Sequence, residues 1–209
     1  MKEITKLNKI FIAIMIVIIL AGIIVTAIYG FNKAIVFKKS TKIEVNIPKG
    51  YEKEDIKQIS KEVFSDKNVL IQDIEKTNQV VSIRIKNYTE DELNNFKAKI
   101  SEKYEIEQDK LSVYEVDVPE TRISTIVLPY VLPVSLTTVL SVVYIALKNI
   151  KKDMLKKVFT LIVSLIAALA LYFSIIAIAR IPVTEYTMPI ALAVYVATLL
   201  ITVTGYNKE

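Results

Sequence analysis

Hydrophobic residues in this chain are gathered into four long blocks, from which charged residues are largely absent. The first block runs from Ile10 to about Tyr29 and contains no charged side chain. A helix of that length is about 30 Å long, which matches the hydrocarbon thickness of a membrane. The three later blocks cover about Ile123–Leu147, Val158–Ala179 and about Tyr186–Thr204. The pattern therefore predicts four membrane-spanning helices.

The first block follows a lysine-rich start, which is also the arrangement of a secretory signal peptide. However, its apolar part is longer than the roughly 7–15 residues of such a signal, and no clear Ala-x-Ala cleavage site follows it. We therefore expect an uncleaved anchor rather than a removable signal.

Residues 31–122, between the first and second blocks, contain short apolar segments of the kind found in a globular domain. Apolar and polar residues alternate in 42–47 and 81–85, which is the period of a strand. Residues 69–74 form an apolar run, and 111–118 are rich in β-branched and aromatic residues, so we expect a strand at each. The region is therefore predicted to contain four strands.

Two helices are predicted among these strands. Residues 56–64 place their apolar side chains on one side of a helix. Thr89 and Glu92 have the spacing of a capping box, and apolar residues continue behind them at helical spacing to Ile100. The resulting order, β-α-β-β-α-β, is that of the ferredoxin-like fold, in which two helices cover one face of an antiparallel sheet. The expected fold class is a membrane α-helical bundle with an α+β ferredoxin-like domain.

Positive charge in the short loops predicts the orientation of the spans. The loop between the third and fourth blocks offers Arg180 and Glu185, whereas the loop between the second and third is rich in lysine: Lys148, Lys151, Lys152, Lys156 and Lys157. The lysine-rich loop is expected in the cytoplasm, together with both termini. Lysines after the first block point the other way, but long domains cross the membrane largely regardless of charge.

These expectations describe a multi-pass cell-membrane protein with three parts. Residues 1–30 form the N-terminal tail and first span, and residues 31–122 form the extracytoplasmic domain. Residues 123–209 form the last three spans and a short tail.

Composition excludes most catalytic chemistry. The 209 residues include no cysteine and no histidine, which removes disulfides, thiolate nucleophiles, the usual zinc sites and histidine acid–base catalysis. Adjacent acidic pairs lie near predicted helix starts, where they complement the helix dipole. The net charge of +5 comes mainly from lysine, whereas nucleic-acid readers rely on arginine and aromatic residues. We expect no enzyme activity, no cofactor, no metal and no nucleic-acid partner.

One segment after the first block resembles a motif of the SecD/SecF family of protein-export subunits. That family has a G-x-D-F-x-G-G-T-x-x-E-V stretch after its first helix, and this chain matches it at Phe37, Thr41, Glu44 and Val45. The glycines of the motif are replaced by Ala34, Lys39 and Ser40. A second similarity, to the G-Y-S-x-N-D segment that follows the fourth helix of SecF, is carried by Gly205, Tyr206 and Asn207.

The resemblance implies a SecF-like subunit, shortened after the fourth helix, that assists protein export. Its partner would be a SecD-like protein or the translocation channel, and its outer domain would contact passing chains. SecD/SecF proteins are similar to proton-driven transporters, which need ionisable groups inside the membrane. The polar groups of the second, third and fourth predicted spans are hydroxyls, so we expect no proton relay in this chain.

An alternative is a permease or regulatory subunit that resembles FtsX. Such proteins share the layout of one helix, an outer domain and three helices, and they work with a cytoplasmic ATPase. The lysine-rich loop would then be the docking surface for the ATPase. The simpler interpretation of that loop is a cytoplasmic topology signal attracted to anionic membrane lipid.

Overall fold

The computed structural model of the chain describes residues 2–65, 69–73, 79–149 and 153–206. The chain divides into two compact units, which we call the helical unit and the sheet unit. The helical unit consists of Met1–Asn32 and Ile123–Glu209, and the sheet unit consists of Lys33–Arg122. The sheet unit is thus inserted in the chain between the first long helix and the other three.

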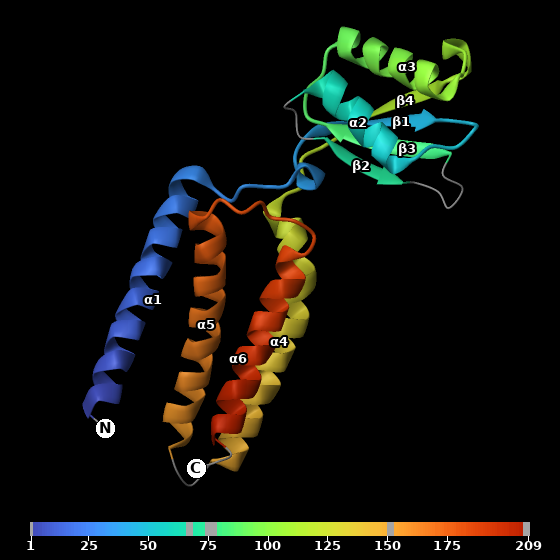
Figure 1. The fold of residues 1–209 in the computed structure, drawn as a ribbon. Coiled ribbons are helices and arrows are strands. Elements are labelled where there is room, and N and C mark those ends of the chain that lie inside the picture. The colour runs from blue at the N-terminus through green and yellow to red at the C-terminus, as the bar shows by residue number, and fades with distance from the viewer. Residues whose placement is uncertain (1, 66–68, 74–78, 150–152, 207–209) are drawn as a thin grey trace. The chain divides into compact units, whose positions relative to one another are not determined.

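The helical unit is built from α1 (Lys2–Tyr29), α4 (Ile123–Lys148), α5 (Met154–Ile178) and α6 (Thr187–Tyr206) (Figure 1). Within the described residues, four helices are long and apolar enough to cross a membrane. They coincide with the four hydrophobic blocks, so the prediction of four long apolar helices at these positions is confirmed. Helix α4 runs unbroken although it contains two prolines.

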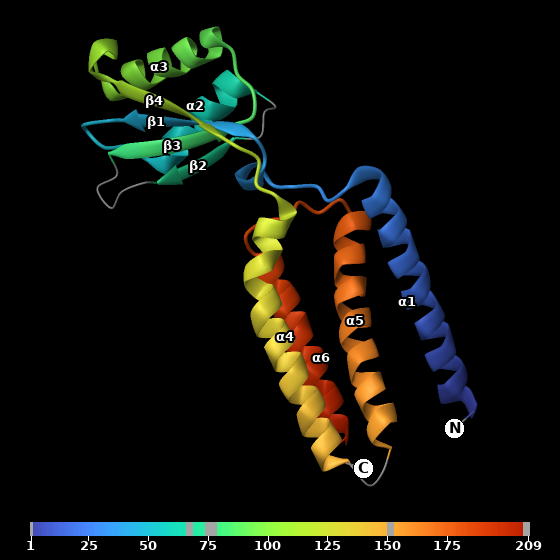
Figure 2. The same ribbon diagram turned by 180° about the vertical axis from the view of Figure 1, so that it is seen from behind.

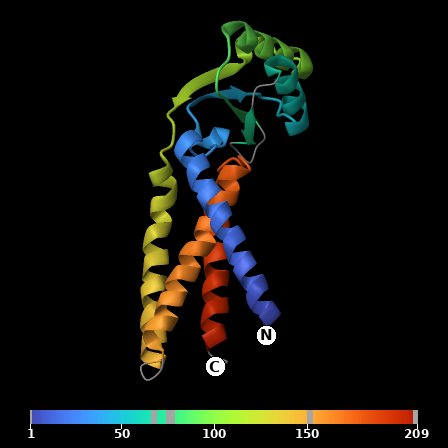
Figure 3. The same ribbon diagram turned by 90° about the vertical axis from the view of Figure 1, so that its left-hand side faces the viewer.

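Helix α5 packs against each of the other three helices of its unit. Figure 3 shows that α1 and α5 cross each other, and α1 contacts the unit mainly through this crossing. The rest of α1 presents large apolar side chains outward; Phe11, Val17 and Ile24 are each more than half exposed. A surface of that size and character is suited to hydrocarbon and not to water.

The described residues of the sheet unit form strands and helices in the predicted β-α-β-β-α-β order. They are β1 (Ser40–Asn46), α2 (Lys53–Phe64), β2 (Leu70–Asp73), β3 (Val80–Ile85), α3 (Glu90–Tyr104) and β4 (Ser112–Val118). Two short 3-10 turns, η1 (Ile35–Phe37) and η2 (Gln108–Lys110), are additions that the sequence pattern does not indicate.

The strands of the sheet unit form one antiparallel sheet with the spatial order β2-β3-β1-β4 among the described residues. Helices α2 and α3 lie on one face of this sheet (Figure 1), and Figure 2 shows the face that they leave open. The strand register places Ile43 opposite Ile83, and Val45 opposite Val81. These four side chains lie on the helix side and are fully buried, as the alternating pattern predicts.

Two aromatic residues join the helices over this sheet. Phe64 of α2 and Phe96 of α3 are fully buried, and their ring centroids are 5.3 Å apart. Helix α3 begins with the predicted capping box: the Thr89 hydroxyl accepts from the Glu92 N–H, and the Glu92 carboxylate accepts from the Thr89 N–H. The core of the sheet unit therefore uses the apolar positions that periodicity identifies.

Candidate functional site

The first candidate site is the base of the sheet unit, where the chain enters and leaves it. The Lys33 ammonium donates to the Glu120 carboxylate at 2.6 Å and to the Thr121 carbonyl at 3.0 Å. The Thr121 N–H donates to the Phe37 carbonyl at 3.0 Å. One step further in, the Thr41 hydroxyl donates to the Asp117 carboxylate at 3.2 Å. We call this set of contacts the base ladder; its members are Lys33, Phe37, Thr41, Asp117, Glu120 and Thr121.

The base ladder extends the pairing of β1 with β4 beyond the sheet itself. The bond between Thr41 and Asp117 lies within the paired strands, whose last pair is Ser40 and Val118. The contacts of Lys33 and Phe37 continue outward from that pair. The turn η1 is also bonded to strand β3, because the Arg84 guanidinium donates to the Val36 carbonyl at 3.1 Å. The segment entering the sheet unit and the segment leaving it are therefore held to each other.

The outermost contact of the base ladder is the ion pair between Lys33 and Glu120. The hydrogen bond and charge of Lys33 hold the pKa of the Glu120 carboxyl below its ordinary value. The Glu120 side chain is 58% exposed, so solvent weakens the attraction. The pair contributes to local order more than to overall stability.

The motif positions that carry the SecF resemblance have different roles here. Phe37 and Thr41 belong to the base ladder. Val45 is a fully buried core residue, whereas Glu44 lies on the open face of the sheet and pairs with Lys42. The structure therefore places two motif residues together at the base and does not gather all four into one site.

The second candidate site is the lysine-rich end of the helical unit. Lys151 and Lys152 lie outside the described residues, as does Asn207. Lys148 and Lys156 are exposed, and the Lys148 ammonium lies 5.8 Å from the centre of the Tyr144 ring.

Lys157, by contrast, is half-buried and used inside the protein. Its ammonium donates to the Asn149 side chain at 3.0 Å and lies over the Tyr206 ring. The Tyr206 hydroxyl donates in turn to the Lys157 carbonyl at 3.1 Å. These contacts tie the C-terminal end of α6 to the start of α5, so Lys157 and Tyr206 have a structural role. The space beside Gly205 is open, since a Cβ added there would meet no described heavy atom within 4 Å.

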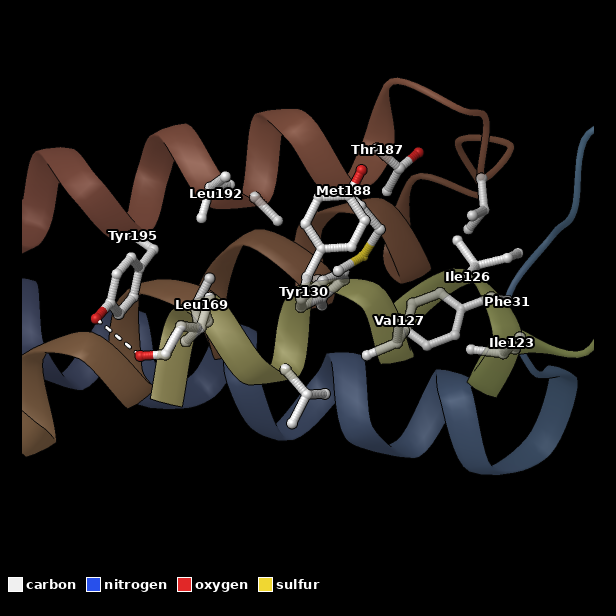
Figure 4. Close-up of a pocket in the computed structure, with 15 residues that line it drawn as sticks. Phe31, Ile123, Ile126, Val127, Tyr130, Leu169, Thr187, Met188, Leu192 and Tyr195 are labelled. Atoms are coloured by element: carbon white, nitrogen blue, oxygen red, sulfur yellow. Dashed lines mark hydrogen bonds between the residues drawn. The ribbon is translucent and has the colours of Figure 1, made fainter. Parts of the chain in front are cut away.

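The third candidate site is a cavity of about 400 Å³ among α4, α5 and α6 (Figure 4). Its lining is almost wholly apolar and includes Phe31, Ile123, Tyr130, Phe173, Met188 and Leu192. At one end, the Tyr195 hydroxyl lies 2.9 Å from the Thr138 hydroxyl, which itself donates to the Val134 carbonyl. The polar groups at that end are therefore paired, and the cavity offers an apolar surface without an acid or a base.

Other hydroxyl groups of the spans bond mainly within their own helix. Thr137, Thr198 and Thr202 each donate to the carbonyl four residues earlier, at 2.7 to 2.8 Å. Such bonds satisfy each hydroxyl within its own helix. In the part of the chain that the structure describes, no cluster of three or more acidic, histidine or cysteine side chains is placed to hold a metal ion.

Two structural positions were missed by sequence reasoning. A Cβ added to Gly22 would overlap the Cβ and hydroxyl of Ser174, so a glycine is needed where α1 crosses α5. Arg180, which the loop charges treat only as a topology signal, donates to the Gly30 carbonyl at 2.7 Å and lies over the Tyr29 ring. A lone glycine in a long apolar helix was the only available signal for the first, and none existed for the second.

No protein-family model matches this chain, and no curated protein matches it.

Proposed function

We propose that this protein is a SecF-like auxiliary membrane subunit that assists protein export without a proton relay of its own. In this proposal it resides in the cell membrane with both termini in the cytoplasm and the sheet unit outside. The sheet unit contacts passing chains, and the helical unit binds a SecD-like protein or the translocation channel.

The arrangement of the sheet unit supports this proposal. Its β-α-β-β-α-β order, the strand order β2-β3-β1-β4 and the placement of both helices on one face are those expected of a ferredoxin-like fold. A domain of this kind inserted after a first apolar helix is the layout that the family resemblance implies. Fold alone does not establish the function, so a more local observation has to carry the proposal.

That observation is the base ladder. It joins the two segments that connect the sheet unit to α1 and α4, and two motif residues, Phe37 and Thr41, take part in it. Because these segments are bonded to each other, they cannot twist or separate independently without breaking the contacts of the ladder. A pull on the sheet unit is therefore transmitted to both segments together, which suits a subunit that relays motion and performs no chemistry.

The test is in-cell photo-crosslinking of the full chain, with a photoreactive amino acid at Tyr114, an exposed position of β4. The expected products are adducts with a channel component, a SecD-like protein or an exported precursor. A matched probe at Leu155, an exposed position of α5, reports contacts of the helical unit. Recovery of a cytoplasmic ATPase at the Leu155 probe, with no export component, would favour the FtsX-like alternative and overturn the proposal. Recovery of no export component at either position would overturn it as well.

A further inference from the structure

Strand β4 is an edge strand whose outer side has no partner in the described part of the chain. It pairs with β1 on one side, and no backbone hydrogen bond joins residues 112–118 to any other described segment. Figures 1 and 2 show β4 at the margin of the sheet, beside β1. Alternate residues of such a strand point their N–H and C=O groups outward, which leaves a template for pairing with another strand.

The two faces of this edge differ in chemistry. Glu115 lies opposite the buried Ile43, so Glu115 and Asp117 point to the helix side of the sheet. Tyr114 and Val116 point to the open face and are 64% and 50% exposed. An added strand would therefore meet carboxylates on one face and apolar surface on the other.

In the part of the chain that the structure describes, the two carboxylates at this edge are bonded by neutral groups and not by a cation. Glu115 accepts from the Tyr88 hydroxyl, and Asp117 accepts from the Thr41 hydroxyl, both of which are uncharged donors. Neither carboxylate forms a salt bridge with a described residue. Burial, the hydrogen bond to Glu115 and the charges of Glu115 and Asp117 raise the pKa of Tyr88 to about 12.

We propose that the free edge of β4 binds an extended polypeptide segment as an added strand and selects one in which basic and apolar residues alternate. Basic side chains lie beside Glu115 and Asp117, and apolar side chains lie beside Tyr114 and Val116. A second copy of this chain is a poor occupant. Antiparallel pairing of β4 with itself brings acidic side chains opposite or diagonal to one another, which is unfavourable.

This inference rests on the proposed function only for the source of the segment, which is a chain in export. The binding mode depends on β4 alone. Peptide binding without export partners in the crosslinking experiment would retain the binding mode and remove the export role. Export partners without peptide binding would support the export role and overturn the proposed binding mode.

The test measures binding of fluorescent peptides, matched in length to β4, to the purified full chain in detergent micelles. A peptide of alternating lysine and valine is expected to bind about tenfold more tightly than one of alternating glutamate and valine, because two cross-strand charge pairs change sign. The lysine peptide with N-methyl groups on alternate residues cannot donate its backbone bonds and is expected to lose binding. Equal binding of the methylated peptide, no preference for lysine, or no binding at all would overturn the proposal.

A matched pair of variants assigns the effect to β4. Glu115→Gln with Asp117→Asn keeps hydrogen-bonding capacity toward Tyr88 and Thr41 but removes the charge, so the preference for lysine should be largely lost. Glu54→Gln with Glu102→Gln removes the same charge from exposed helix positions and should retain the preference. An equal loss in both double variants, or self-association of the chain through β4 in analytical ultracentrifugation, would contradict the inference. If the first double variant fails to fold, the peptide comparison on the unmodified chain still decides the question.

Discussion

At the scale of single residues, polar side chains in this protein act as ties between segments that are distant in the chain. Lys33 ties the two connections of the sheet unit together, and Arg180 ties the end of α5 to the end of α1. Tyr195 ties α6 to α4 through Thr138. Their common effect is to restrict how the elements move against each other.

The outer rung of the base ladder should respond to pH. The pKa of Glu120 is lowered in the folded protein, so the stabilisation from its pair with Lys33 is present above the unfolded pKa and is lost as pH falls through the folded pKa. We expect the difference in thermal stability between the unmodified chain and Glu120→Gln to shrink as pH falls below 4.5, the ordinary value. Differential scanning fluorimetry across that range measures it. A difference that is constant with pH would contradict the role assigned to Glu120.

The hydrogen bond between the Tyr195 and Thr138 hydroxyls, at the end of the cavity, should make a small, measurable contribution to the free energy of unfolding. Tyr195→Phe removes the phenolic group and leaves the Thr138 hydroxyl bonded to Val134, so no buried donor is orphaned. We expect a loss of about 0.6 kcal/mol, the mean for hydrogen bonds between membrane helices. A double-mutant cycle with Thr138→Val in detergent measures the coupling. Tyr186→Phe, at a position that is 65% exposed, is the control and should have almost no effect.

At the scale of elements, the crossing of α1 and α5 depends on the absence of a Cβ atom at Gly22. The two helices are otherwise apolar, and apolar side chains provide little specificity when lipid is equally apolar. Specific association then depends on how closely the backbones approach, and small residues permit that approach. Gly22 on α1 and Ser174 on α5 are such a pair, and the Ser174 hydroxyl also lies 3.4 Å from the Ile19 carbonyl.

Gly22→Ala should therefore destabilise the chain even though alanine favours a helix. The added Cβ meets Ser174, and overpacking of this kind costs about 1–3 kcal/mol. Gly205→Ala is a matched control, because the space around Gly205 is open and the change should be neutral or slightly stabilising. Thermal unfolding in micelles compares them, and Ser174→Gly should restore stability to Gly22→Ala. Equal effects at the two glycines would show that the crossing does not need a glycine.

At the scale of the whole molecule, the proposed function requires the sheet unit to lie on the opposite side of the membrane from the lysine-rich end. The antiparallel helices put the start of α1 and the end of α6 at one end of the helical unit (Figure 1). Loop lysines favour the cytoplasm for that end. We predict this orientation from the loop charges alone. Substitutions at exposed positions can test it without disturbing the fold.

Single-cysteine labelling in intact cells measures this orientation directly, because the chain contains no cysteine of its own. Lys57→Cys, on an exposed position of α2, should react with a membrane-impermeant maleimide added from outside. Lys156→Cys, on an exposed position at the start of α5, should react only after the cells are permeabilised. The reverse labelling pattern would place the sheet unit in the cytoplasm and rule out its contact with chains outside the cell.

The sequence by itself determined the long helices and the order of strands and helices in the sheet unit, because periodicity, apolar runs and residue type mark them locally. The short turns η1 and η2 have no such signal. Four hydrophobic blocks predicted α1, α4, α5 and α6, and alternation predicted β1 and β3 in the core. The capping box at Thr89 and Glu92 identified the start of α3. These features are local, because they depend on residues only a few positions apart in the chain. Apolar side chains avoid water in any fold, so their spacing is informative without the tertiary structure.

Only the tertiary structure decided which residues meet. The base ladder joins Lys33 to Glu120, and the helix crossing joins Gly22 to Ser174, across sequence separations that no periodicity spans. The free edge of β4 is likewise a property of the strand order. Strand β1 lies between β3 and β4, so β4 is at the margin of the sheet and pairs on one side only. The residues that could carry function here are single polar or small side chains in ordinary local sequence, and proximity in space is what makes them a site.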